Sequence, residues 1–95
     1  MTSPSSSGAL EAVERILNRG GEPNEVLRQV VAALQERTGA RVGIAFPPQE
    51  APSESVQTHE IVWQGKPVAA LWTSEQGERA LFARVAVIVA PYCSR

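Results

Sequence analysis

The segment 78–90 constrains the fold more than any other, because its side chains are apolar nearly all the way round a helix. Leu81, Val85 and Ile88 recur at helical spacing and form one stripe. The rest of the apolar surface comprises Phe82, Ala83, Ala86, Val87, Val89 and Ala90. The β-branched residues would also suit a strand. Because the segment opens with good helix formers, we predict a helix that ends at Pro91.

Such a helix must be buried on more than one side, and a sheet can cover only one of them. The remaining apolar surface has two candidate covers. One is the amphipathic helix predicted over Gly8–Arg19, which would cover it within the same chain. The other is a second copy of the chain, which would make the protein a homodimer. For a homodimer, the candidate interface residues are Leu10, Val13, Leu17, Ala83 and Val87.

A second helix and a strand are predicted before the middle of the chain. Pro23 suits the first position of a helix and Gly39 the position after its end, which predicts a helix over Glu22–Thr38. The next segment, Arg41–Phe46, alternates apolar residues with polar or small ones, as is typical of a strand. A proline pair ends this strand, because proline cannot donate to a sheet ladder. A loop over 47–55 follows.

A β-hairpin is predicted from the strands Val56–Trp63 and Val68–Thr73. Gly65 lies between them and supplies the positive φ that a tight turn needs. If Gln64-Gly65 forms the whole loop, Ile61 faces Val68 across the hairpin. A slip of one residue would exchange the two faces of the sheet.

This hairpin register places His59, Trp63 and Trp72 on one face of the sheet, and they are the candidate ligand-binding residues. Two interpretations of the tryptophans stay open. They either cover the sheet as ordinary core residues or form an open aromatic platform for a ligand or peptide.

Composition limits the size and the partners of the protein. At 95 residues the chain is one domain, with an expected disordered tail over residues 1–7 and a single domain over residues 8–95. Nine Lys and Arg residues are scattered among ten Asp and Glu residues, so we expect no nucleic-acid partner. We expect no secretory signal, because residues 1–7 have neither a basic start nor an apolar stretch, and no membrane span, because the longest apolar run is too short. With Cys93 as the only cysteine, we expect a cytoplasmic protein with no membrane partner.

Residues that could carry catalytic chemistry are few. The chain has one histidine, His59, one cysteine, Cys93, and no Asp. These residues supply neither a set of metal ligands nor a base with a nucleophile and an orienting group. We therefore expect no enzymatic activity, no metal and no cofactor. Cys93 follows the negative end of the closing helix, which would raise the pKa of the thiol and leave it inert.

Three parts of the chain resemble GAF domains. Residues 26–34 with 38–44 resemble the second helix and first strand of that family, residues 61–71 resemble its last strand pair, and residues 78–86 resemble its closing helix. The resemblance implies a central antiparallel sheet with the terminal helices on one face, where they mediate dimerisation. It also implies a pocket on the other face for a cyclic nucleotide, a bilin, a haem or a metabolite.

The chain is shorter than a typical GAF domain, because a loop over 47–55 replaces the segments that roof the ligand pocket. We therefore expect an α/β chain of the α+β type, with three helices and an antiparallel sheet of three or slightly more strands, in the order α-α-β-β-β-α. The expected function is a minimal GAF-like regulatory or interaction module in signalling, homodimeric and non-catalytic. The alternative is a sensor that binds a metabolite or nucleotide on the helix-free face of the sheet.

Overall fold

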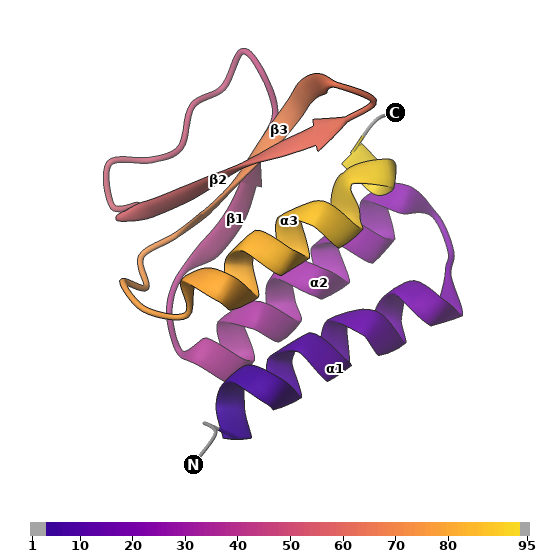
Figure 1. Ribbon diagram of the computed structural model, residues 1–95, viewed down its shortest axis with the longest axis vertical. Helices are drawn as coiled ribbons and strands as arrows, with labels where there is room; N and C mark the ends of the chain where they lie inside the picture. Colours follow the sequence, from indigo (N-terminus) through magenta and orange to yellow (C-terminus); the bar gives the residue numbers. More distant parts are fainter. Residues whose placement is uncertain (1–3, 94–95) are drawn as a thin grey trace.

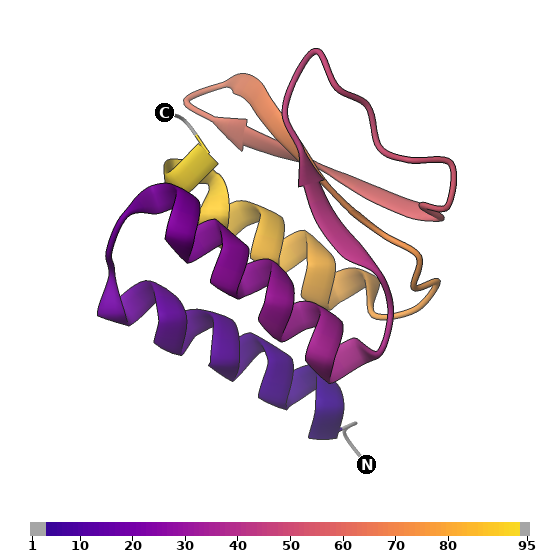
Figure 2. The ribbon, with the colours of Figure 1, turned by 180° about the vertical axis from the view of Figure 1, so that it is seen from behind.

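The helices and the sheet of this chain form separate layers. The computed structural model describes residues 4–93, which form α1 (Pro4–Arg19), α2 (Pro23–Thr38), β1 (Val42–Ala45), β2 (Gln57–Trp63), β3 (Lys66–Thr73) and α3 (Arg79–Cys93). The sheet is antiparallel with strand order β1-β3-β2. α2 and α3 pack on one face of the sheet, and α1 lies behind them without touching it (Figures 1 and 2). This architecture confirms the predicted α+β class and the order α-α-β-β-β-α.

The first two helices end where predicted, and α2 begins within one residue of its predicted start, whereas α1 begins four residues earlier than predicted. α1 starts at Pro4, so residues 4–7 belong to the helix rather than to the expected disordered tail, whose residues 1–3 lie outside the described part of the chain. At α2 the carboxylate of Glu22 accepts a hydrogen bond of 3.1 Å from the N–H of Glu25, and Pro23 is the first helical residue. The N–H of Gly39 donates to the carbonyl of Gln35 and closes the helix. Pro23 and Gly39 lie where the sequence predicts them, whereas the capping carboxylate of Glu22 was not predicted.

The hairpin has the predicted turn but a different register. Trp63 faces Lys66 across Gln64-Gly65, yet an irregularity between Ile61 and Val62 shifts the pairing by one residue. Ile61 therefore faces Ala69 rather than Val68, and the predicted register is wrong beyond the turn. The physical reason lies at Pro67, opposite Val62, because proline lacks the N–H that a regular ladder would use there.

α3 is longer than predicted and fills the space between the other layers. It continues through Pro91 to Cys93, so the predicted end at Pro91 is wrong. A proline inside a helix has no N–H to donate to the carbonyl four residues earlier, yet α3 includes Pro91 and continues for two more residues. Phe82 and Val89 are fully buried. The rest of the chain therefore buries most of the apolar surface of α3, but it leaves Val87 exposed.

A close approach between β1 and β3 needs glycine at position 43. Gly43 pairs with Trp72 of β3, and the indole lies across the glycine on the helix-free face. A Cβ atom at this position would come within 2.5 Å of the indole ring. Glycine therefore provides the space in which Trp72 covers the sheet, and this placement supports the covering interpretation for that tryptophan.

We expect Gly43→Ala to lower the free energy of unfolding by about 1–3 kcal/mol, because the indole must leave its place or the strands must separate. Urea denaturation followed by circular dichroism measures the change. Gly8→Ala is the matched control, since its added methyl meets only the far end of the Arg37 side chain at 3.3 Å. Equal stability of the two variants would contradict the packing described.

Candidate functional site

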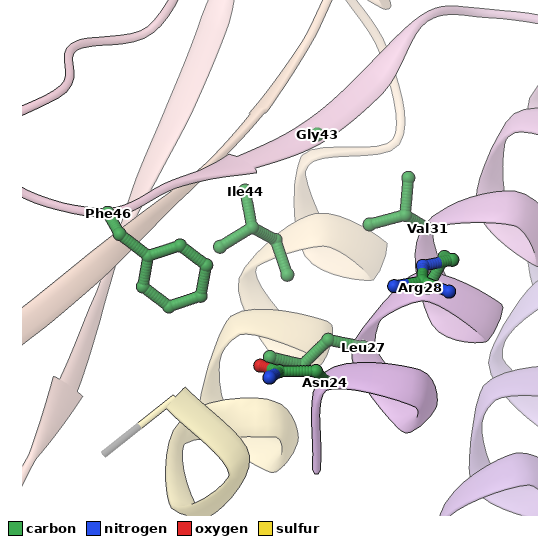
Figure 3. A pocket seen from close by; sticks show the side chains of 7 residues that line it. All are labelled: Asn24, Leu27, Arg28, Val31, Gly43, Ile44 and Phe46. Atoms are coloured by element: carbon green, nitrogen blue, oxygen red, sulfur yellow. The ribbon is translucent and has the colours of Figure 1, made fainter. Parts of the chain in front are cut away.

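A groove between β1 and α2 is the first candidate site, shown in Figure 3. Its volume is about 370 Å³ and its lining residues are Asn24, Leu27, Arg28, Val31, Gly43, Ile44 and Phe46. Ile44 points from β1 toward Leu27 and Val31, while Asn24 and Arg28 lie on the exposed side of α2. The β1/α2 groove, defined by these seven residues, therefore has an apolar floor and a polar rim.

The strand beside this groove has backbone groups that no other strand pairs. Arg41 bonds to Ser74 through both its N–H and its carbonyl, whereas the N–H of Val42 points the other way and donates to Oε1 of Gln35 at 3.1 Å. Because the direction alternates along an antiparallel strand, the N–H and carbonyl of Ile44 also point away from β3. Since β1 is an edge strand, these two groups face the open side of the sheet.

A second groove lies at the opposite edge, between β2 and α3. Its volume is about 290 Å³ and its lining residues are His59, Glu60, Val62, Ala83, Ala86 and Val87. Large apolar side chains are exposed beside it: Val62 is 45%, Trp63 36% and Val87 67% exposed. We call the six lining residues together with Trp63 the β2/α3 surface. Its exposed aliphatic and aromatic groups form a surface typical of protein contacts.

The helix-free face of the sheet carries a third hollow. Its volume is about 440 Å³ and it is lined by Ala45, Pro47, Gln49, Thr58, Glu60, Pro67, Ala69 and Ala70. Small side chains make space here, and the loop that follows β1 forms one wall. Glu60 is the only charged residue of this sheet hollow.

The structure does not bring the three predicted ligand-binding residues together. His59 pairs with Leu71 and Trp72 pairs with Thr58, so the histidine and this tryptophan lie on opposite faces of the sheet. Trp63 stands beside the turn at the end of the hairpin. The shift in register separates them, as a slip of one residue must.

His59 belongs to a network that fixes the start of α3. The side-chain amide of Gln57 donates to the carbonyls of Glu75 at 2.9 Å and Gly77 at 3.1 Å. Its oxygen therefore faces Nε2 of His59, which donates to it. Burial, and secondly the positive charge of Arg79, lower the pKa of His59 from its ordinary value of 6.5. This network is structural, and sequence reasoning missed Gln57 because nothing in a strand pattern marks a buried glutamine.

The predicted interface residues divide between the core and the surface. Val13 is fully buried within the chain and cannot contact a partner. Leu10 and Leu17 of α1 are half-buried and pack against the core. Ala83 and Val87 are exposed, and both line the groove beside β2.

Cys93 is buried in the last turn of α3, with 4% of its surface exposed. Burial raises the pKa of its thiol to about 11. The direction agrees with the sequence prediction, although the cause is desolvation rather than the helix dipole. A thiol that stays protonated is a poor nucleophile.

Comparison of the chain with protein-family models, curated proteins and solved structures gives no match. Within residues 4–93, no three His, Cys, Asp or Glu side chains lie close enough together to hold a metal ion. None of the helices in that range has the length and apolar character needed to cross a bilayer.

We expect the free energy of unfolding to fall as the pH drops from 7 to 5. The folded state lowers the pKa of His59, so it binds fewer protons than the unfolded state. Stability is therefore full above about pH 6.5 and is lost as the pH falls through the folded-state pKa. Urea denaturation at a series of pH values measures this slope.

His59→Gln is the matched variant for this prediction, because its amide can still donate to Gln57 but does not titrate. Since His59 is the only histidine, the variant should show a flatter dependence between pH 7 and 5. Identical slopes for the two proteins would contradict a titrating His59 in the network.

Proposed function

We propose that the chain is a non-catalytic, GAF-like regulatory module of the cytoplasm that works as a homodimer through its β2/α3 surface. The observation that carries the proposal is the exposure of Val62 and Val87 beside an edge strand. Burying apolar side chains such as these against a second apolar surface gives a favourable free energy of association. A domain of this size also gains stability from pairing, because its own core is small.

The edge of β2 supplies the backbone part of this interface. Ala70 and Trp72 of β3 bond toward β1, so alternation turns the neighbouring residues of β3 toward β2. The same alternation leaves the N–H and carbonyl groups of Thr58 and Glu60 on the free edge of β2. Two copies related by a twofold axis could pair these edges antiparallel and make one continuous sheet.

Such a pairing is closed, because each copy contributes the same surface. It would place the α3 helices of the two copies next to each other and cover Ala83 and Val87. Of the residues predicted for the interface these two are retained, whereas the partly packed Leu10 and Leu17 and the buried Val13 are not. The proposed interface therefore excludes α1 and combines the exposed side of α3 with β2.

We expect Val87→Lys to raise the dissociation constant of the dimer about tenfold or more, because a charge replaces an apolar contact next to Arg84. Sedimentation equilibrium over a range of concentrations measures the constant, with circular dichroism confirming the fold.

Phe46→Lys is the control, because Phe46 is an exposed apolar residue (40%) beside the other edge strand. It should leave the dimer intact. A wild-type protein that stays monomeric at high micromolar concentration would overturn the proposal, as would a dimer that only Phe46→Lys dissociates.

A second candidate function is a small-molecule sensor that uses the sheet hollow. The observation that favours it is the volume of about 440 Å³ on the helix-free face, which lies within the usual range of ligand pockets of about 300–1,000 Å³. Glu60 is its only charged lining residue and no cation accompanies it. This charge favours a neutral or amine-bearing metabolite over a nucleotide, whose phosphates the carboxylate would repel.

For this second candidate, we expect an amine-bearing compound from a panel of amino acids, polyamines and nucleotides to raise the melting temperature by several degrees at saturation. Ala70→Leu, which fills the hollow, should abolish the shift, whereas Ala80→Leu on the exposed side of α3 should keep it. Differential scanning fluorimetry provides the measurement. A panel without any hit, or a shift that persists in Ala70→Leu, would count against the sensor.

A further inference from the structure

We infer that the β1/α2 groove binds an extended peptide segment, which adds to β1 as a further strand and carries one large apolar side chain and one acidic side chain. This site is separate from the proposed dimer interface, because β1 and β2 are the opposite edges of the sheet. The inference therefore stands or falls independently of the homodimer.

The backbone of β1 determines how the peptide would bind. The N–H and the carbonyl of Ile44 both point to the open edge, so a peptide residue opposite Ile44 can exchange two hydrogen bonds with it. The N–H of Val42 is already taken by Gln35, which limits the pairing at that end. β1 has four residues and a proline pair follows it. The edge therefore suits a short segment of a partner rather than a long strand.

The side chains of the groove determine which residues the peptide would carry. Alternate residues of an added strand point to the same side, so one side chain would enter between Ile44 and α2. There it would meet Leu27 and Val31, which form an apolar floor in a volume of about 370 Å³. The ring of Phe46, 40% exposed at the end of β1, would cover the next apolar atoms of the peptide. A large aliphatic or aromatic side chain fits this environment.

Charge at the rim selects an acidic peptide. Arg28 is the only charged residue that lines the groove, and Asn24 adds an amide beside it. The guanidinium bonds to Glu25 at 3.1 Å, but the two side chains are 74% and 52% exposed. A surface pair of this kind is worth little, so a peptide carboxylate can replace Glu25 and accept two parallel hydrogen bonds from the guanidinium.

Nuclear magnetic resonance of the full chain labelled with ¹⁵N tests the inference. The probes are three acetylated and amidated seven-residue peptides that alternate Thr with Leu and carry Glu, Gln or Lys at the sixth position. We expect the Glu peptide to shift the amide signals of Ile44 and Phe46 and to bind about threefold more tightly than the Lys peptide. Val87→Lys, at a concentration where sedimentation shows it to be a monomer, should bind it equally well.

Two charge-reversal variants separate recognition at the rim from general attraction. Arg28→Glu should reverse the preference, so that the Lys peptide binds more tightly than the Glu peptide. Arg15→Glu, an equal change of charge on the exposed side of α1, should keep the original order. The inference is overturned if no peptide shifts the signal of Ile44, or if the order of affinities is the same in Arg28→Glu. It is also overturned if the shifts fall on Thr58 and Glu60 instead, or if dilution of the free protein alone produces them.

Discussion

The burial of α3 on two sides is the constraint on which the rest of this structure depends. The sheet covers one side of this helix, and α1 and α2 cover another, so one segment joins all the layers. Phe82, Val85 and Val89 have no exposed surface. Because apolar burial is the main favourable term in folding a small domain, the strands and the other helices are arranged around this segment. What they leave uncovered is the flank of α3 beside β2.

The sequence was sufficient to predict the α+β class and the order of the elements, because helical periodicity and caps are local signals. The start of α2 at Pro23 and its stop at Gly39 are examples, since each residue acts on its own neighbours. The sheet register was not predictable in the same way. It depends on how Pro67 and Val68 share the space opposite Val62, which is a property of two strands together. Because of one irregularity there, His59 and Trp72 lie on opposite faces of the sheet and do not form the predicted ligand site.

The candidate sites follow from the small number of strands. In a sheet of three strands only the central strand is paired on both sides. The other two, β1 and β2, are edge strands whose free backbone groups can pair with a partner. Helices pack below both edges, and each edge therefore has a groove beside it. Reasoning from the sequence identified Ala83 and Val87 through the apolar excess of the last helix. It missed Arg28, Ile44 and Phe46 as a group, because they come together only when α2 lies along β1.

The buried amide of Gln57 has a consequence for how the sheet and the helices are joined. It ties the first residue of β2 to the carbonyls of Glu75 and Gly77, just before α3 begins. Two hydrogen bonds therefore hold the strand at the sheet edge to the segment that leads into the central helix. α3 in turn packs against the sheet, α2 and α1, so these bonds lie where the sheet and the helical layers meet. One glutamine side chain thus joins two segments that are 18 to 20 residues apart in the sequence.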